Sequence, residues 1–263
     1  MMSRAPGKVW FVGAGPGAAD LLTVRAIRVL ARADIVLHDA LMTEALLEWA
    51  PGATHVAVGK RCEGAAMPQA SIDRALIDAA RRHAVVVRLK GGDPGVFGRL
   101  DEEIDALDAA GIPWEIVPGI TSASAAAAAA GHSLTRRGVA RAVQIVTPRI
   151  GRGEQGDGQW ARGLDPAATV VLYMAGRMAQ ACARTLLGHG FAAHTPVVAV
   201  RAASWLQQSI ERTDLTRLAR DGLTIDERPV VLMVGDAVRE RTPVPSSRVV
   251  LGSDCRAEVV SSH

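Results

Sequence analysis

A run of charged and glycine residues in the first half of the chain has the composition of a ligand-binding loop. Residues 88–99 read RLKGGDPGVFGR and follow a β-branched segment. The adjacent glycines Gly91 and Gly92 let a ligand approach the main chain closely, and the Asp93 carboxylate accepts hydrogen bonds from hydroxyls or an amine. GGDP alone is compatible with an ordinary loop. The twelve consecutive residues favour a site for a polar nucleoside.

A second glycine-rich segment lies near the N-terminus. Residues 13–18, GAGPGA, satisfy the pattern G-x-G-x-x-G/A, and Asp39 follows at the end of the next β-type segment. This arrangement is typical of a Rossmann-type NAD(P)-binding oxidoreductase, while a tight turn without a ligand is the plainer interpretation. Pro16 removes one of the backbone N–H groups that a Rossmann loop uses to cradle phosphate. The motif alone therefore leaves both interpretations open.

The composition indicates a folded protein that acts on small molecules. Of the 263 residues, 49% are hydrophobic and 22% are charged, which is enough apolar surface to offset the conformational entropy lost on folding. The net charge is only +3 and aromatic residues make up 3%. Neither a basic stripe nor a base-stacking platform is indicated, so we expect no nucleic-acid partner.

The cysteines and the first residues indicate the compartment. Cys62, Cys182 and Cys255 are odd in number and lack CxxC spacing, so no disulfide framework and no metal site is predicted. Residues 1–8 lead into a strand without the apolar core of a signal peptide, and no apolar run reaches the length of about 18 residues that spans a membrane. These patterns predict a cytoplasmic protein without membrane association.

Short β-branched segments alternate with longer helical patterns along the chain. The predicted strands cover residues 9–12, 35–38, 56–58, 85–89, 115–117, 143–147, 170–173, 197–200 and 230–234. The predicted helices cover residues 21–31, 69–82, 102–110, 122–130 and 179–189. This alternation predicts an α/β fold with largely parallel sheets.

Two prolines and a glycine within residues 112–120 separate the first five predicted strands from the others. We therefore place a domain boundary at Gly119, which gives an N-terminal α/β domain over 1–119 and a C-terminal α/β domain over 120–241. The Ser- and Pro-containing residues 242–263 are expected to form a disordered tail.

The two glycine loops belong to a larger set of motifs. The set comprises GAGPG at 13–17, LLT at 21–23, ADIVLHD at 33–39, VGKR at 58–61, PQ at 68–69, RLKGGDP at 88–94, VFGR at 96–99, VPGITS at 117–122, LT at 134–135, YM at 173–174 and VG at 234–235. In these motifs the chain resembles the tetrapyrrole methylases, which are class III S-adenosyl-L-methionine-dependent methyltransferases. GKR together with VFGR is most similar to the branch that methylates uroporphyrinogen III.

The resemblance implies two α/β domains with the active site in the cleft between them, and usually a homodimer. It implies C-methylation of uroporphyrinogen III at two ring positions, which gives precorrin-2 in sirohaem- or cobalamin-type tetrapyrrole biosynthesis. S-adenosyl-L-methionine is the implied cofactor, with S-adenosyl-L-homocysteine as its product. The implied cofactor-binding residues are Pro16, Gly91, Gly92, Asp93, Val96, Thr121, Ser122, Met174 and Ala203. A methylase of a later corrin precursor, a binding-only relative and the Rossmann oxidoreductase are the alternatives.

On the acceptor side, the resemblance assigns proton transfer or substrate binding to Asp39, Lys60, Arg99 and Glu102. Arg99 and Glu102 lie one helical turn apart at the entrance of a predicted helix, and residues three apart on a helix share a face. Chemistry favours Asp39 or Lys60 as the proton acceptor, because a guanidinium scarcely gives up its proton. Arg99 would then orient the substrate.

The implied substrate carries many carboxylates, which cationic side chains bind well. The candidate clamps are Arg61, Arg136 and Arg137, and solvated surface charge is an equally good interpretation of the last two. Some residues depart from the family pattern, namely Ala18, Ala40, Ala65, Arg136 and Arg201. Most of them lie in loops or on the acceptor side, so the cofactor site is expected to be intact while the exact substrate stays open.

Overall fold

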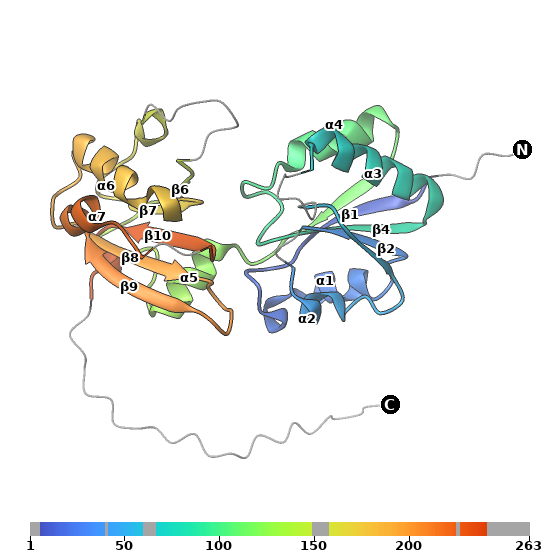
Figure 1. Cartoon of the computed structure of the whole chain (residues 1–263), viewed down its shortest axis with the longest axis horizontal. Coiled ribbons are helices and arrows are strands. Elements are labelled where there is room, and N and C mark those ends of the chain that lie inside the picture. The colour runs from blue at the N-terminus through green and yellow to red at the C-terminus, as the bar shows by residue number, and fades with distance from the viewer. Residues whose placement is uncertain (1–5, 40–41, 60–66, 149–157, 225–226, 241–263) are drawn as a thin grey trace, which may run out of the picture.

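The computed structural model describes residues 6–39, 42–59, 67–148, 158–224 and 227–240, and within them it contains two five-stranded sheets in two lobes (Figure 1). The N-terminal lobe contains β1 (Lys8–Gly13), η1 (Ala19–Leu21), α1 (Val24–Leu30), β2 (Ile35–His38), α2 (Glu44–Leu47), β3 (Thr54–Ala57), α3 (Gln69–Arg82), β4 (Val85–Lys90), α4 (Leu100–Ala109) and β5 (Trp114–Val117). The C-terminal lobe contains α5 (Ser122–Ala130), β6 (Val143–Val146), η2 (Gln159–Ala161), β7 (Thr169–Tyr173), η3 (Gly176–Met178), α6 (Ala179–Gly188), β8 (Pro196–Arg201), β9 (Ser209–Asp214), α7 (Leu215–Asp221), β10 (Val230–Val234) and η4 (Asp236–Val238).

The sheet of the N-terminal lobe is parallel throughout, with the strand order β3-β2-β4-β1-β5. Strands of this kind are apolar because helices cover both faces of the sheet, and β4 begins with three consecutive valines. The carboxyl ends of parallel strands lie at one edge, so the segments that follow β1, β2, β4 and β5 converge there. Ligands of open α/β sheets bind at this edge.

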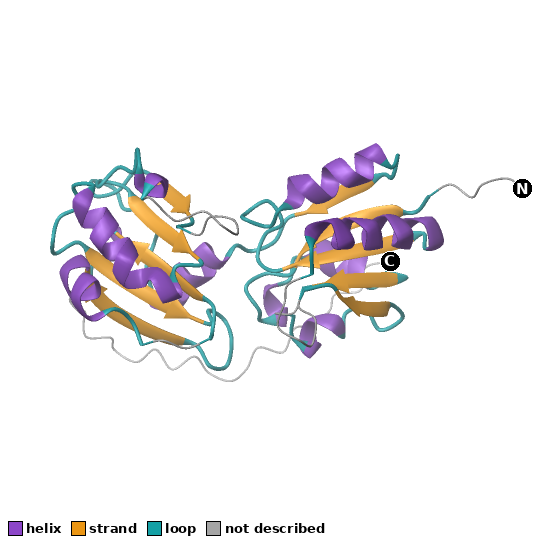
Figure 2. Cartoon of the chain, turned by 45° about the horizontal axis from the view of Figure 1, so that its top comes forward, coloured by secondary structure: helices purple, strands orange, loops and turns teal. Residues whose placement is uncertain are grey.

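Different helices cover the two faces of this sheet (Figure 2). Residues of α1 and α2 pack with Val87 and Leu89 against one face, whereas residues of α3 and α4 pack with Val86 against the other. Successive residues of β4 therefore point to opposite cores, as the two-residue period of a strand requires. By the same alternation, Arg88 and Lys90 lie on the face that α3 and α4 cover.

The sheet of the C-terminal lobe is mixed, with the strand order β6-β7-β10-β8-β9. Only β6 and β7 pair in parallel, while the other three pairings are antiparallel. The expectation of largely parallel sheets is therefore correct for the N-terminal lobe and wrong for the C-terminal lobe. The connection 202–208 between β8 and β9 is too short for the crossover of about a dozen residues that parallel neighbours need.

Helix α5 packs on one face of this mixed sheet, and α6 and α7 pack on the other. The buried side chains of α5 are all alanines, and they contact Val171, Val198 and Met233. Small side chains bring the helix axis close to the sheet, as the alanine run predicts. This position places the first residue of α5, Ser122, beside the N-terminal lobe.

The predicted elements agree with the structure where the sequence pattern is strong. Helices 69–82 and 122–130 are found with the predicted bounds, and each predicted strand overlaps an observed one. The prediction missed α2, β9 and α7. The two α/β lobes are confirmed, and the placement of the boundary at Gly119, between β5 and α5, stays a prediction. Residues 242–263 lie outside the described residues. Among the described helices, none is long and apolar enough to cross a membrane.

Candidate active site

A cleft opens between the two lobes at the carboxyl edge of the parallel sheet. It encloses about 980 Å³, including space that is open to solvent. The N-terminal lobe contributes the segments that follow β1, β2 and β4, and the C-terminal lobe contributes the start of α5 and the segments that follow β7 and β8. The lining residues are Gly15, Pro16, Gly17, Asp39, Met42, Leu46, Lys90, Gly91, Gly92, Asp93, Val96, Phe97, Gly98, Thr121, Ser122, Tyr173, Met174, Trp205 and Pro229.

The two glycine loops pair with each other at the base of the cleft. The Gly15 N–H donates to the Gly92 carbonyl oxygen at 3.1 Å, and the Gly92 N–H donates to the Gly15 carbonyl oxygen at 2.7 Å. The Asp93 carboxylate accepts from the Gly95 N–H at 2.8 Å and from the Gly119 N–H at 2.9 Å. Asp93 thus fastens its own loop to the chain between the lobes, and only its remaining lone pairs are available to a ligand.

Gly119 is a position where the backbones approach too closely for any side chain. A Cβ atom there would lie 2.2 Å from the Gly92 carbonyl oxygen and 2.8 Å from the Gly13 Cα. The VPG motif therefore supplies the one residue type that lets the chain pass from β5 to α5 across the glycine loops. This close packing fixes where the C-terminal lobe begins relative to the cleft.

The C-terminal lobe contributes an uncharged wall. The Tyr173 hydroxyl hydrogen-bonds the Thr121 hydroxyl and accepts from the Ala123 N–H at 2.7 Å, which ties the end of β7 to the start of α5. Burial raises the pKa of Tyr173, so the phenol stays protonated at neutral pH. The Tyr173 ring lies 5.4 Å from that of Phe97, a contact between the lobes. Met174 has a left-handed φ of 55° and its side chain is exposed at the cleft.

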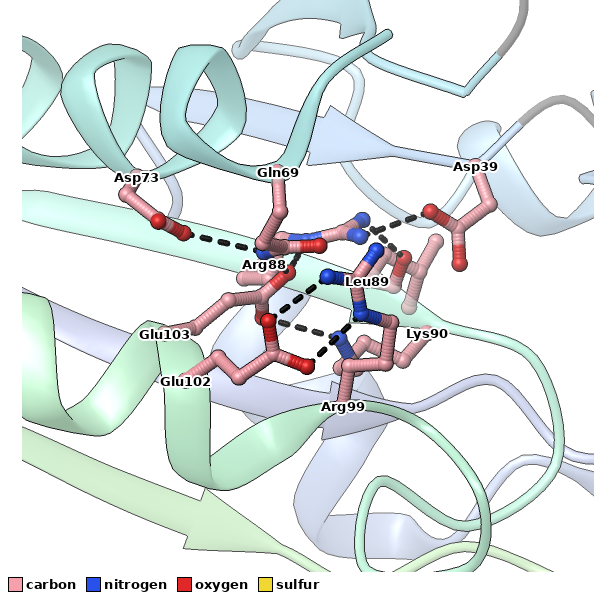
Figure 3. A network of polar contacts seen from close by, with 9 residues as sticks. All are labelled: Asp39, Gln69, Asp73, Arg88, Leu89, Lys90, Arg99, Glu102 and Glu103. Atoms are coloured by element: carbon pink, nitrogen blue, oxygen red, sulfur yellow. Dashed lines mark hydrogen bonds and ion pairs between the residues drawn. The ribbon is translucent and has the colours of Figure 1, made fainter. Parts of the chain in front are cut away.

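A buried network of charged residues lies under the N-terminal wall (Figure 3). Glu103 of α4, only 1% exposed, binds both cations of β4 through its two oxygens: Oε1 accepts from Arg88 at 3.1 Å and Oε2 accepts from Lys90 at 2.8 Å. The Arg88 Nη2 donates to Asp39 Oδ1 at 2.7 Å. Two cations and two carboxylates thus balance in charge, as burial requires.

The two cleft residues of this network, Asp39 and Lys90, differ in environment. Asp39 directly follows β2 and lines the cleft. Its side chain is 35% exposed and is held by Arg88. The Lys90 side chain is 4% exposed, and its pKa is lowered, first by burial and then by the nearby Arg88 charge. Arg88, which binds Asp39, and Glu103, which binds both cations, were not among the predicted site residues. The signal for the cations is the alternation Arg88-Leu89-Lys90, in which two cations share one face of an apolar strand, whereas Glu103 has no such local signal.

Arg99 and Glu102 lie together at the start of α4, as their spacing predicts. Arg99 donates from Nε at 2.7 Å and from Nη2 at 2.6 Å to the two Glu102 oxygens, and both side chains are about half exposed. They line a shallower hollow with Phe97 and Gly98, which also line the cleft. The Glu102 hydrogen bond raises the pKa of Arg99, and the Arg99 hydrogen bond lowers that of Glu102. A raised pKa disfavours Arg99 as a proton acceptor.

Most of the expected cofactor residues lie together in the cleft. Eight of the nine line it, namely Pro16, Gly91, Gly92, Asp93, Val96, Thr121, Ser122 and Met174. Ala203 does not: it is buried against the core of α5, and Trp205, two residues later on the same connection, lines the cleft in its place. Trp205 was not predicted, because an isolated tryptophan carries no motif.

The expected acceptor residues are more scattered. Arg136 and Arg137 are exposed in a turn that closes at the Arg136–Ala140 bridge, and neither lines the cleft. Lys60 and Arg61 lie outside the described residues, as do Ala40 and Ala65 among the departures from the family pattern. The Ala18 N–H donates to Ser204 Oγ. Arg201 is buried and pairs with Glu211 of β9 at 3.1 Å, so its charge has a partner within the C-terminal sheet.

Fold and site together define an α/β protein that holds a small ligand between two lobes. The strand order 3-2-4-1-5 differs from the 3-2-1 order of a Rossmann half, because β4 lies between β1 and β2. The Rossmann interpretation of the GAGPGA segment is therefore wrong at the level of the fold. A Cβ atom on Gly13 would lie 2.5 Å from the Gly119 Cα, so the backbones of the two residues pack directly against each other. The loop that follows Gly13 faces the other lobe.

Residues 8–219 match the family Tetrapyrrole (Corrin/Porphyrin) Methylases, and the chain belongs to that family. Among curated relatives, the siroheme synthase of Azotobacter vinelandii (strain DJ / ATCC BAA-1303) is 43% identical over 240 residues, which cover 90% of this chain and 52% of that protein. The siroheme synthase of Pseudomonas fluorescens (strain Pf0-1) is 42% identical over 239 residues, covering 89% of this chain and 51% of that protein. The chain thus spans about half the length of these relatives.

Solved structures show the same two-lobed fold. A uroporphyrin-III C-methyl transferase from Thermus thermophilus, complexed with S-adenyl homocysteine, matches with a TM-score of 0.77 and 38% identity, over 89% of this chain and 99% of that one. A cobalt precorrin-4 methyltransferase matches with a TM-score of 0.75 and 29% identity, over 89% of this chain and 96% of that one. The resemblance drawn from the motifs is confirmed.

Proposed function

We propose that the protein is an S-adenosyl-L-methionine-dependent methyltransferase that C-methylates uroporphyrinogen III twice and forms precorrin-2. The observation that carries the proposal is the convergence of eight motif residues on one cleft between the lobes. The 38% identity to a uroporphyrin-III C-methyl transferase, higher than the 29% to a cobalt precorrin-4 methyltransferase, favours this substrate over a later corrin precursor.

The cleft fits the chemistry of the proposed cofactor. Gly91 and Gly92 lack side chains, so a ligand can approach the main chain closely, and Thr121 and Ser122 add hydroxyls. The acidic group Asp93 suits a ligand that carries a sulfonium and an ammonium group. When bound, the cofactor supplies an electrophilic methyl group, so the protein needs no strong nucleophile of its own. Its main tasks are to align the reactants and to remove a proton.

We assign the proton transfer to Asp39. Methyl transfer would break the S–CH3 bond of the sulfonium, form a C–C bond at a pyrrole carbon and leave a cationic ring, which becomes neutral by losing a proton. Asp39 is partly exposed in the cleft and is fixed by Arg88 at 2.7 Å, so its carboxylate is oriented without being enclosed. Lys60 stays the alternative acceptor. Arg99, whose guanidinium stays charged, is assigned to the substrate carboxylates and Glu102 to the pyrrole N–H groups. Arg61, Arg136 and Arg137 are proposed as further clamps.

The test is transfer of a labelled methyl group from S-adenosyl-L-methionine to uroporphyrinogen III. We expect two labels in each tetrapyrrole product. Asp39→Asn is expected to lower the rate by roughly 10²- to 10⁴-fold, the usual contribution of a positioned general base, with cofactor binding retained. Label incorporated only into a later corrin precursor would overturn the substrate, and no incorporation into any tetrapyrrole would overturn the reaction.

The family resemblance also supports a homodimer and a cytoplasmic location, which we propose with this function. Sedimentation at micromolar concentration is expected to give a species of twice 27.6 kDa. A single species at 27.6 kDa would reject the dimer. Cell fractionation tests the location.

A further inference from the structure

The connection between β8 and β9 makes a further contact between the lobes, which is non-covalent, unlike the passage of the chain at Gly119. Ser204 and Trp205, which we call the clasp, reach the GAGPG loop of the N-terminal lobe. The Ala18 N–H donates to Ser204 Oγ at 3.1 Å, and the Trp205 Nε1–H donates to the Pro16 carbonyl oxygen at 2.8 Å. These bonds join residues 186 and 189 positions apart.

The Trp205 ring lies directly over Gly17. Gly17 has a φ of +140°, and a Cβ atom there would lie 1.8 Å from Trp205 Nε1. The indole therefore fills the space above the glycine, and the same ring lines the cleft with Pro16, Gly92 and Asp93. A large aromatic group thus closes the N-terminal glycine loop from the side of the other lobe.

The connection that carries the clasp is held in one conformation. Ala202 and Ser204 are non-glycine residues with φ values of +46° and +70°, a region that costs about 1–3 kcal/mol for such residues. Internal bonds maintain it: the Ser204 N–H donates to Gln208 Oε1 at 2.8 Å and the Trp205 N–H donates to the Ala202 carbonyl at 2.9 Å. Strain that surrounding contacts hold in place is a feature of ligand clamps.

We propose that Trp205 is a positioning residue for the cofactor: with Ser204 it holds the Pro16–Gly17 segment against the cleft, so that the nucleoside-containing ligand binds a preformed wall. The proposal rests on the proposed function, because the ligand is its cofactor. A preformed wall reduces the ordering cost of binding, so loss of the clasp weakens affinity. It leaves the methyl-transfer step unchanged once the cofactor is bound.

Calorimetry with S-adenosyl-L-homocysteine tests the proposal. Trp205→Phe keeps a ring but loses the bond to Pro16 and is expected to raise Kd by about 2- to 10-fold, the range of one hydrogen bond. Trp205→Ala also removes the ring and is expected to raise Kd by tenfold or more. Leu206→Ala is the matched control, because Leu206 lies on the same connection with its side chain fully exposed, at 101%, and its Kd should equal that of the wild type.

Kinetics and fluorescence separate positioning from a general loss of structure. In Trp205→Phe the KM for S-adenosyl-L-methionine should rise while kcat stays within about twofold. We expect binding of S-adenosyl-L-homocysteine beside Trp205 to change the intrinsic tryptophan fluorescence. This change should disappear in Trp205→Phe and persist in Trp49→Phe. Equal Kd values for the wild type and both Trp205 variants, or a fall in kcat with unchanged KM, would overturn the clasp and leave the proposed function intact. A wild-type protein that does not bind S-adenosyl-L-homocysteine would instead reject the proposed function.

Discussion

The two walls of the cleft are built from different chemistry. Every ionisable cleft residue except Tyr173, namely Asp39, Lys90 and Asp93, comes from the N-terminal lobe, whereas the C-terminal lobe contributes Ser122, Met174, Trp205 and other uncharged residues. The charged residues follow parallel strands, and buried partners within the same lobe orient them. Of the uncharged residues, Met174 follows β7 and Trp205 follows β8 of the mixed sheet, and Trp205 reaches the N-terminal lobe through a hydrogen bond to Pro16.

The difference shows how the two lobes divide their tasks. Buried charges need partners at fixed distances, and the parallel sheet supplies these because β4 and α4 belong to one packed core. The C-terminal lobe adds uncharged side chains to the cofactor site, whose other residues come from the glycine loops of the N-terminal lobe. Mutations in the charged network and at the start of α4 should therefore reduce stability or turnover, whereas mutations in the uncharged wall should reduce cofactor affinity.

The largest effect is expected at Glu103. Glu103→Gln leaves Arg88 and Lys90 buried with Asp39 as their one remaining carboxylate in the network. Removing one partner of a buried ion pair costs about 3–5 kcal/mol, and we expect that loss in the free energy of unfolding, measured with urea. Glu102→Gln is the control, because Glu102 and its partner Arg99 are both about half exposed. It should lower the free energy of unfolding by less than about 1 kcal/mol. Equal losses in the two variants would contradict the network.

The next effect separates turnover from cofactor binding. Arg99→Ala and Glu102→Ala should each lower the rate of methyl transfer by about a hundredfold, the cost of misplacing the substrate by about 1 Å. Kd for S-adenosyl-L-homocysteine should not change, because neither residue lines the cleft. Asp105→Ala, exposed on the same helix, is the control. If Kd rises in these variants as much as the rate falls, the assignment of this turn to the substrate is wrong.

A smaller effect is expected where the two walls meet. Gly119→Ala would force a Cβ atom against the backbone of Gly92 and Gly13, which gives way less readily than a side chain. We expect a loss of about 1–3 kcal/mol in the free energy of unfolding, together with weaker cofactor binding. Gly52→Ala has nothing within 4 Å of the new atom and should leave both quantities unchanged. If Gly119→Ala changes neither the free energy of unfolding nor cofactor binding, the backbone contact relaxes at little cost and the prediction is wrong.

The smallest effect is a pH dependence of stability. The folded-state pKa of Lys90 is lowered below the ordinary 10.5, so between these two values the unfolded state binds more protons. The free energy of unfolding therefore rises with pH through that window, and the penalty for burying the charge is fully present below it. Urea titrations across the alkaline range should show this rise in the wild type and in the control Lys8→Met, which replaces a partly exposed lysine. The rise should disappear in Lys90→Met, and its persistence there would contradict the assignment.

The sequence predicts the cofactor side better than the charged side. GAGPG, GGDP and ITS are short local motifs, and all six cofactor residues expected within them line the cleft. Glu103 was missed because its role depends on α4 packing against β4, which no local pattern records. Strand β9 was missed because SIERTD lacks an apolar run, and the direction of the C-terminal strands depends on the length of their connections. Local chemistry is readable, whereas pairing between distant elements is not.

The clasp also determines when the cleft is completed during synthesis. Pro16 and Trp205 are 189 residues apart, so at about 5–20 residues per second Trp205 leaves the ribosome roughly 10–40 s after Pro16. The parallel sheet pairs only strands within residues 8–117 and can form in that interval. The growing chain thus carries its ion-pair network before it can enclose a ligand. The nascent protein therefore gains its full affinity for the cofactor in one of the last steps of folding.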